Sequence, residues 1–148
     1  MVELAVCANP PSAQAAFTQA DALSTWVQIK PLQITDQALK FIIPAPTPPG
    51  LYACRVRSGA DLSPQVLLNA PDPWWLQGDE GKVATPGGWV RVFGRCLAMS
   101  PNRTVALRDA AGKLISLADV KGDQWNLRAP LAADLAPGEY EVLVHNGF

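Results

Sequence analysis

The chain has 148 residues, of which 49 % are hydrophobic and 17 % are charged. This balance is typical of a globular protein with a hydrophobic core and excludes a disordered chain. The net charge is −1 and the basic residues are scattered, which argues against a nucleic-acid or membrane partner because both favour a concentrated basic surface. No apolar stretch reaches the ~18 residues of a membrane-spanning helix.

Most of the predicted elements are short β-strands. One helix is expected over 12–23, where a serine follows two prolines. The other apolar runs are bounded by proline, glycine and polar turn residues, which is typical of an all-β sandwich or barrel. The expected strands span 2–6, 26–29, 39–43, 51–57, 65–69, 89–94, 104–109, 113–117, 124–128 and 140–146. The Asp-Ala-Ala-Gly turn at 109–112 predicts a hairpin with its glycine at positive φ.

One block of sequence occurs twice. Residues 36–59 and 123–147 each begin with Asp-Gln, run through an apolar segment to a proline, and reach Pro-Gly-x-Tyr before an alternating strand. A repeat of this length indicates a repeated structural unit. The first copy has no equivalent of the strand over 89–94 that precedes the second copy, so it is expected to be incomplete at its N-terminal side. A turn-rich linker is expected over 68–88.

The two Pro-Gly-x-Tyr turns resemble the tyrosine corner of immunoglobulin-like sandwiches, in which a tyrosine hydroxyl bonds to the backbone of the preceding loop. Gly50 and Gly138 permit the tight turns, and Tyr52 and Tyr140 are the only tyrosines of the chain. We therefore predict two tandem immunoglobulin-like β-sandwiches, over 1–70 and 71–148, the first degenerate or N-terminally truncated.

The second copy also carries a resemblance to a family. The run PGGWVRVFGR at 86–95, TVALR at 104–108 and LAPGEYEVLVHNG at 135–147 together resemble the immunoglobulin-like IPT/TIG domains, and a degenerate copy covers 2–59. Motifs of this kind imply a fold and carry little information on function.

A narrower resemblance involves PDPWWLQGD at 71–79, RVFGR at 91–95 and VHNGF at 144–148. This combination is similar to the N-terminal region of bacterial multidomain proteins whose next domain is a parallel β-helix of the pectate-lyase type. The resemblance implies a non-catalytic accessory module of a polysaccharide-acting protein, acting as a spacer or cap for the β-helix. It also implies an extracellular or periplasmic location within a longer secreted protein, although this segment has no signal peptide and a cytoplasmic location remains open.

The tandem pair Trp74-Trp75 is the main candidate binding feature. An exposed indole could stack on a sugar ring while Asp72 and Asp79 accept hydrogen bonds from hydroxyl groups. Alternatively, both rings could fill the junction between the two sandwiches, since a small interface needs large apolar residues. The first interpretation makes the chain a carbohydrate-binding module, and the second leaves it a spacer.

Other candidate sites are weaker. His145 and Phe148 are expected to contact a following domain. Glu139 and Glu141 are expected to face solvent, which does not suit a catalytic acid. No nucleophile, metal or cofactor motif is present, so we expect no catalytic residue, no metal and no cofactor, and a stand-alone glycan-cleaving enzyme is only a remote alternative. The expected partner is a polysaccharide or the adjacent catalytic domain.

The three cysteines are expected to be free thiols. Cys7, Cys54 and Cys96 have no metal-ligand spacing. A Cys7–Cys54 disulfide is conceivable, but Leu4 and Val6 look like the inward positions of their strand, which turns Cys7 to the other side.

Overall fold

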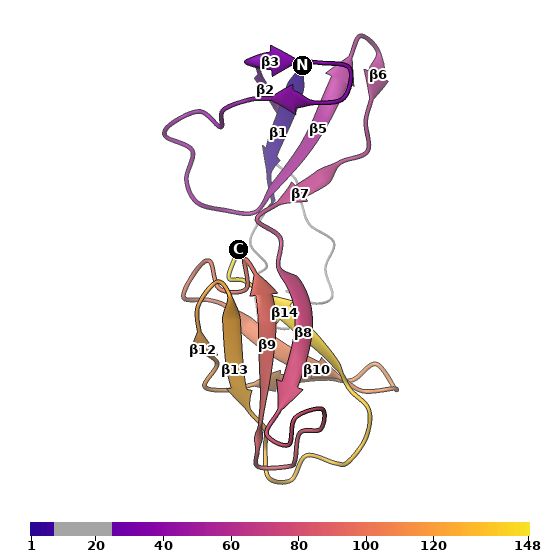
Figure 1. The fold of residues 1–148 in the computed structure, drawn as a ribbon, viewed down its shortest axis with the longest axis vertical. Coiled ribbons are helices and arrows are strands. Elements are labelled where there is room, and N and C mark those ends of the chain that lie inside the picture. The colour runs from indigo at the N-terminus through magenta and orange to yellow at the C-terminus, as the bar shows by residue number, and fades with distance from the viewer. Residues whose placement is uncertain (8–24) are drawn as a thin grey trace. The chain divides into compact units, whose positions relative to one another are not determined.

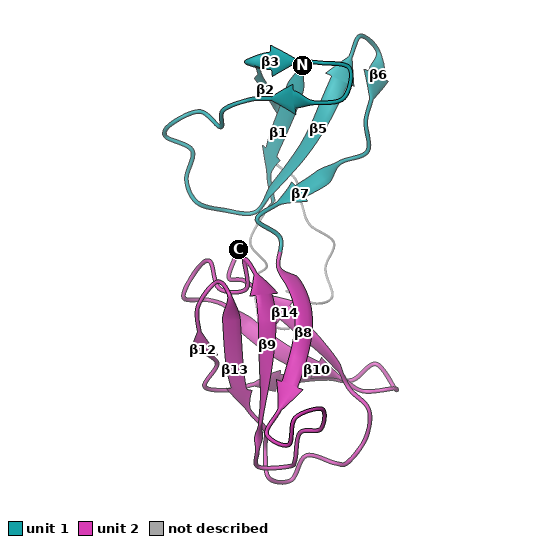
Figure 2. Ribbon diagram, viewed as in Figure 1, with its two compact units in different colours: residues 1–8, 21–70 teal, residues 9–20, 71–148 magenta. Residues whose placement is uncertain are grey.

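The computed structural model describes residues 1–7 and 25–148, so the helix predicted over 12–23 lies outside the described residues. The described elements are strands, β1 to β14, and they form antiparallel sheets (Figure 1). The all-β prediction is confirmed. Among the described residues, 1–7 and 25–70 form one compact unit, unit 1, and 71–148 form a second, unit 2 (Figure 2).

Unit 1 is built on one five-stranded sheet with a small two-stranded ladder. The sheet has the order β2-β1-β5-β6, and β7 also pairs with β5, while β3 pairs with β4. The strands are β1 (Val2–Val6), β2 (Val27–Ile29), β3 (Gln33–Ile34), β4 (Leu39–Lys40), β5 (Tyr52–Ser58), β6 (Asp61–Leu62) and β7 (Val66–Leu68). The prediction missed β3 and β6, because two-residue strands are too short to produce a periodic pattern.

The core of unit 1 lies on one face of this sheet. Val2, Leu4, Ile29 and Tyr52 form a buried cluster, as the alternation of side chains along strands requires. The prediction for the end of β1 was wrong, because Val6 is 41 % exposed and Cys7 is buried.

The three cysteines lie in the described residues and form no disulfide with one another. Cys54 pairs with Leu4 across the ladder, whereas the N–H of Cys7 bonds to the carbonyl of Leu51 at 2.9 Å. The two cysteines are therefore three register positions apart, which is too far for a disulfide. Burial raises the pKa of the Cys54 thiol.

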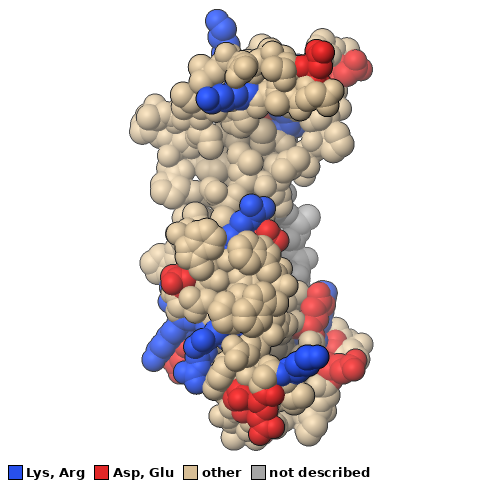
Figure 3. Space-filling view, in the orientation of Figure 1, with Lys and Arg blue, Asp and Glu red and all other residues tan. Residues whose placement is uncertain are grey.

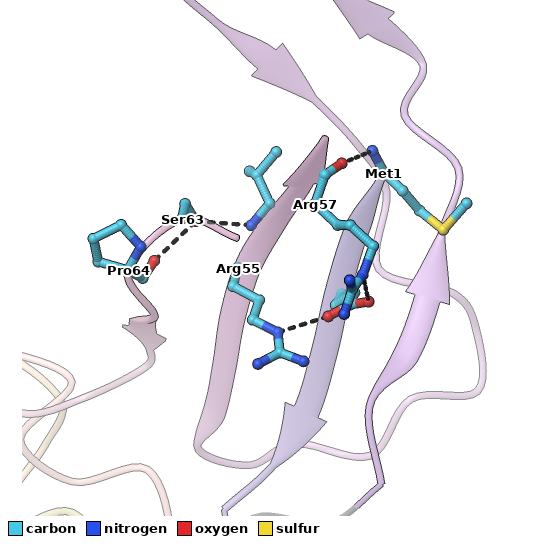
Figure 4. A network of polar contacts seen from close by, with 7 residues as sticks. Met1, Arg55, Arg57, Ser63 and Pro64 are labelled. Carbon is cyan, nitrogen blue, oxygen red and sulfur yellow. Dashed lines mark hydrogen bonds and ion pairs between the residues drawn. The ribbon is translucent and has the colours of Figure 1, made fainter. Parts of the chain in front are cut away.

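The other face of β1 and β5 carries a buried ionic network (Figure 4). Glu3 is only 3 % exposed, and its two carboxylate oxygens accept hydrogen bonds from Nε of Arg55 and Nε of Arg57, each at 2.6 Å. The hydrogen bonds from Arg57 and Arg55 hold the pKa of Glu3 below its ordinary value. The N-terminal amine of Met1 donates to the carbonyl of Arg57 at 2.8 Å, so the network ties the start of the chain to β5.

Unit 2 is β-sandwich-like, with two antiparallel sheets. One sheet has the order β12-β13-β9-β8 and the other has the order β11-β10-β14. The strands are β8 (Asp72–Gly78), β9 (Trp89–Arg95), β10 (Thr104–Arg108), β11 (Leu114–Leu117), β12 (Lys121–Gly122), β13 (Asn126–Pro130) and β14 (Glu141–His145). The predicted hairpin is confirmed, since β10 pairs antiparallel with β11 and Gly112 has a φ of +82°.

The core of unit 2 is formed by both sheets. Its buried residues are Val90, Val92, Leu97, Val105, Leu107, Leu127, Ala129 and Leu131. They come from the inward positions of β9, β10 and β13 and from adjoining loops, as in sandwiches whose inner faces interdigitate. The outward positions of β9 and β13 are therefore left on the surface of the β12-β13-β9-β8 sheet.

The predicted linker is partly wrong, because β8 is a seven-residue strand inside it. This strand was not predicted because Pro71 and Pro73 interrupt the strand pattern of the sequence. Proline is nevertheless tolerated in an edge strand, and β8 is the edge of its sheet. At Gly94 of β9 an added Cβ would lie 2.2 Å from the carbonyl oxygen of Asp72, so glycine allows the close approach of the two strands.

Candidate functional site

The outward side of the β12-β13-β9-β8 sheet, called the outer face below, is the candidate site. Along β9, Val90 and Val92 point into the core, and Trp89, Arg91 and Phe93 alternate with them on the outer face. The sequence alternation of β9 therefore places two aromatic rings and a guanidinium group on one face of the sheet, where each of the three side chains is half-buried.

The outer face carries a stacked pair of aromatic rings. Trp75 of β8 lies opposite Phe93 of β9 in the ladder, and their ring centroids are 3.8 Å apart with the planes 9° from parallel. Trp75 is nevertheless 52 % exposed. The indole is thus held parallel to the Phe93 ring while part of its surface faces solvent. A ring fixed in this way loses little side-chain entropy when it binds a ligand.

Trp74 is exposed for a local reason. The ladder between β8 and β9 shifts register between Pro73 and Trp75, and such a bulge adds one residue to one strand. The extra residue interrupts the alternation, so Trp74 is 60 % exposed beside an exposed Trp75.

Asp72 joins Trp74 in a polar cluster at the end of β8. The indole Nε1 of Trp74 donates to Asp72 Oδ2 at 3.2 Å, and Nε of Arg95 donates to the same oxygen at 2.9 Å. Three of the four residues predicted to bind carbohydrate, Trp74, Trp75 and Asp72, therefore lie together at one end of the outer face.

Asp79, the fourth predicted residue, does not join them. It follows the other end of β8, about 13 Å from Trp75 at ~3.3 Å per residue. Its carboxylate accepts hydrogen bonds from the hydroxyl and the N–H of Thr85, and from the N–H of Trp89 at 3.5 Å. The Thr85 hydroxyl, with the Thr85 N–H, holds the pKa of Asp79 below its ordinary value. Asp79 therefore fastens the loop between β8 and β9.

A row of polar and basic residues crosses the outer face next to the stacked pair. The register aligns Gln77 with Arg91, Arg91 with Arg128, and Arg128 with Lys121. The guanidinium carbon of Arg128 lies 4.8 Å from the centroid of the Trp89 ring, and that of Arg91 lies 5.5 Å from it. Figure 3 shows basic side chains over β12 and β13, with acidic side chains among them, beside a largely uncharged area over the middle of β8 and β9.

Sequence analysis did not single out Arg91, Phe93 or Arg128. The alternating run over 89–95 contained the signal that Trp89, Arg91 and Phe93 share a face. The contact of Trp75 with Phe93 and the pairing of Arg91 with Arg128 had no signal in the sequence, because they depend on which strands pair with β9 and in which register.

At each of the two predicted tyrosine corners, the tyrosine hydroxyl is bonded to the preceding loop. The hydroxyl of Tyr140 donates to the carbonyl of Ala136 at 2.7 Å, and the hydroxyl of Tyr52 donates to the carbonyl of Pro48. Both bonds reach four residues back into the preceding loop. A Cβ added at Gly50 would lie 3.4 Å from the Tyr52 ring, and a Cβ added at Gly138 would lie 3.8 Å from the Tyr140 ring.

His145 and Phe148 lie at the C-terminal end of unit 2 and are half-buried. The Nδ1 atom of His145 accepts a hydrogen bond from the N–H of Gly147 at 3.2 Å, and the N–H of Phe148 donates to the side-chain oxygen of Asn146 at 3.2 Å. These contacts order the last residues of the chain.

Acidic groups elsewhere in the described part of the chain do not gather into a metal site. Glu139 and Glu141 are exposed, and Glu141 pairs with Arg108. Among residues 1–7 and 25–148, no three His, Cys, Asp or Glu side chains lie close enough together to hold a metal ion. The same residues contain no helix of the length and apolarity needed to cross a membrane.

Comparison with known proteins finds no match to this chain among protein-family models, curated proteins or solved structures.

Proposed function

We propose that the chain is a non-catalytic carbohydrate-binding module made of immunoglobulin-like units, accessory to a polysaccharide-acting protein. The observation that carries this proposal is the stack of Trp75 on Phe93, in which an indole is fixed flat and half-exposed. A flat, immobilised aromatic ring presents its face to the C–H groups of a pyranose ring, and the polar cluster of Asp72, Trp74 and Arg95 beside it can hydrogen-bond sugar hydroxyl groups.

The strand order supports the immunoglobulin-like assignment of unit 2. If β8 to β14 are taken as strands A, B, C, C′, D, E and F, the two sheets have the orders A-B-E-D and C′-C-F, which is the arrangement of the immunoglobulin fold apart from strand G. Tyr140 directly precedes β14, and its bond to Ala136 has the geometry of the tyrosine corner at the start of strand F.

The same assignment applies to unit 1 through the repeated block. Tyr52 and β5 correspond to Tyr140 and β14, so the order β2-β1-β5-β7 corresponds to C′-C-F-G, and β3 and β4 correspond to D and E. The described part of unit 1 has no counterpart of strands A and B. This pattern supports the interpretation of unit 1 as an incomplete copy.

A spacer or cap for a following β-helix, the other function implied by the resemblance, would use the C-terminal end of unit 2. His145 and Phe148 lie at that end and are half-buried, whereas Trp74 and Trp75 are 60 % and 52 % exposed. The larger exposed aromatic surface is on the outer face, and it favours binding as the function.

The proposal is tested by affinity electrophoresis of the full chain in gels that contain plant, algal and bacterial polysaccharides. We expect retardation in at least one gel, and Trp75→Ala is expected to weaken binding about tenfold, which corresponds to the ~1.4 kcal/mol of one aromatic contact. Trp125→Ala is the matched control, because Trp125 is 54 % exposed and lies in the turn before β13. Absence of retardation in every gel, or equal losses in both variants, would contradict the proposal.

A further inference from the structure

We infer that the polysaccharide recognised by the outer face is acidic, and that Arg91, Arg128 and Lys121 bind its carboxylate or sulfate groups. This inference rests on the proposed function and specifies its ligand class. It is carried by the juxtaposition of the stacked aromatic pair with a row of basic residues that have no acidic partners within the described part of the chain.

The row is created by strand register. Gln77, Arg91, Arg128 and Lys121 occupy one line across the four strands β8, β9, β13 and β12. In a sheet, residues directly opposite each other on neighbouring strands have Cβ atoms about 5 Å apart. Three positive charges therefore lie side by side on one exposed surface.

The charges of this row are not compensated by the protein. Among the described residues, Arg55, Arg57, Arg95 and Arg108 pair with carboxylates, and Arg103 donates to the carbonyl of Val120. The two remaining arginines, Arg91 and Arg128, contact aromatic rings instead. The Nε atom of Arg91 is buried and has no hydrogen-bond partner.

This arrangement is costly for an isolated protein. Like charges directly opposite each other on neighbouring strands are destabilising. Local conflicts of this kind are expected at functional sites, where a ligand resolves them. An anionic group over the row would neutralise the repulsion between Arg91 and Arg128.

The rings that flank the row hold the guanidinium groups in place. Arg91 lies between Phe93 and Trp89, with its guanidinium carbon 5.8 Å from the first centroid and 5.5 Å from the second. Arg128 lies over the same Trp89 ring at 4.8 Å. Planar guanidinium groups fixed in this way match carboxylate and sulfate oxygens better than a mobile ammonium group does.

The spacing also suits a substituted sugar chain. The stacked pair and the basic row are two residues apart along β8 and β9, a rise of about 7 Å. A pyranose ring on the face of Trp75 would thus place the acidic substituent of the same or the next sugar over Arg91. The aromatic pair provides the stacking surface and the basic row provides the charge selectivity.

Affinity electrophoresis and calorimetry of the full chain test this inference with two matched pairs of probes. Polygalacturonate and its methyl ester differ in carboxylate charge, and dextran sulfate and dextran differ in sulfate groups. We expect binding to at least one acidic probe and at least tenfold weaker binding to its neutral counterpart. The acidic probe that binds identifies the anionic group.

The variants Arg91→Gln and Arg128→Gln are each expected to weaken binding to the acidic probe about tenfold, the size of one charge-assisted hydrogen bond. Arg108→Gln is the matched control, because Arg108 is a paired arginine on β10, in the other sheet. The affinity of this variant for the acidic probe is expected to be unchanged. Arg91→Lys keeps the charge and is expected to recover part of the affinity. The melting temperature of Arg128→Gln is expected to be at or above that of the unsubstituted chain, which separates a binding defect from misfolding.

The outcomes distinguish the two proposals. Equal binding of acidic and neutral polysaccharides, with no effect of the arginine variants, would overturn the ligand class and leave the carbohydrate-binding function intact. No binding to any polysaccharide would overturn both. Tight, Arg91-dependent binding of oligothymidylate in place of a polysaccharide would also overturn both, because aromatic rings and basic residues together can bind single-stranded nucleic acid.

Discussion

In unit 1, the strand that follows the tyrosine corner, β5, is paired on both sides by β1 and β7. The equivalent strand of unit 2, β14, is paired with β10, and no described strand lies on its other side. The two copies of one sequence block therefore form the same corner and the same central ladder but different sheets. What surrounds a repeated block depends on the segments outside it.

The second layers of the two units differ even more. Besides its main sheet, the described part of unit 1 has the short ladder β3–β4, from which Leu39 packs against the buried cluster, whereas unit 2 has the four strands β12, β13, β9 and β8. The buried cluster comprises four residues in unit 1 and eight in unit 2. The candidate outer face belongs to this additional layer, and therefore the described part of unit 1 has no counterpart of it.

The open side of β14 has a structural consequence for unit 2. A groove of about 450 Å³ lies along it, lined by apolar residues that include Leu76 of β8, Leu135, Tyr140 and Val142. Leu76 pairs with the buried Val92 but is 47 % exposed. Unit 2 thus has the larger core of the two, and that core reaches the surface along one edge.

The largest effect that separates the units is expected from core truncation. Leu127→Ala removes a side chain that is 0 % exposed between the two layers of unit 2, and is expected to destabilise that unit by about 4 kcal/mol. Leu4→Ala in unit 1, where the residue is 5 % exposed under a thinner layer that can relax, is expected to cost about 2 kcal/mol.

Hydrogen exchange resolved by residue measures the two losses separately. Val66→Ala, at a position that is 62 % exposed, is the control and is expected to change stability by less than about 0.5 kcal/mol. A larger loss for Leu4→Ala than for Leu127→Ala would show that the single main sheet of unit 1, not the second layer, dominates the packing.

Acid is expected to destabilise unit 1 before unit 2. The pKa of Glu3 is lowered from 4.5 by Arg57 and Arg55, and the pKa of Asp79 is lowered from 3.8 by Thr85. A carboxylate whose pKa is lower in the folded state than in the unfolded state stabilises the protein at pH values above its unfolded-state pKa. This stabilisation is lost as the pH falls through its folded-state pKa. The loss therefore begins below pH 4.5 in unit 1 and below pH 3.8 in unit 2.

The check is the exchange protection of each unit between about pH 5 and about pH 3. Glu3→Gln is expected to lower the stability of unit 1 at neutral pH and to flatten its acid dependence, with unit 2 unchanged. Asp79→Asn is expected to lower the stability of unit 2 at neutral pH and to flatten the acid dependence of unit 2, with unit 1 unchanged. An unchanged acid profile of unit 1 in Glu3→Gln would show that the network around Arg55 and Arg57 does not stabilise the fold.

The smallest effect is expected from the corners that the units share. Tyr52→Phe and Tyr140→Phe each remove one hydroxyl hydrogen bond, which contributes about 1 kcal/mol. Tyr52 is only 3 % exposed, so the carbonyl of Pro48 has less access to water and the loss is expected to be larger there. Denaturant unfolding of the two variants measures the difference, and equal losses would show that burial does not distinguish the corners.

Much of the strand pattern could be predicted from the sequence. The run over 2–6 coincides with β1, and those over 89–94 and 104–109 lie within one residue of β9 and β10, because alternating valine and leucine side chains bounded by turn residues leave few alternatives. The prediction failed at β8, where proline and a bulge interrupt the alternation, and at β12, which has two residues.

The candidate site was also only partly predictable from the sequence. The exposure of one or both tryptophans was one of two open interpretations, and the bulge at Trp74 in the ladder between β8 and β9 gives a local reason for the exposure that the structure shows. Asp79 had the residue type of a sugar ligand, but the fold uses its carboxylate to hold the N–H and hydroxyl of Thr85. Residue type alone does not show which hydrogen-bonding groups are already satisfied.

The sequence by itself determined the class of the fold and the side of β9 that carries Trp89, Arg91 and Phe93. These depend on residue order within one segment, where alternation and turn chemistry are local. Only the tertiary structure decided that Phe93 would meet Trp75, and that Arg91 would lie beside Arg128 without an acidic partner. Those contacts depend on strand pairing and register, and a shift of one residue would have turned the same side chains to the opposite face.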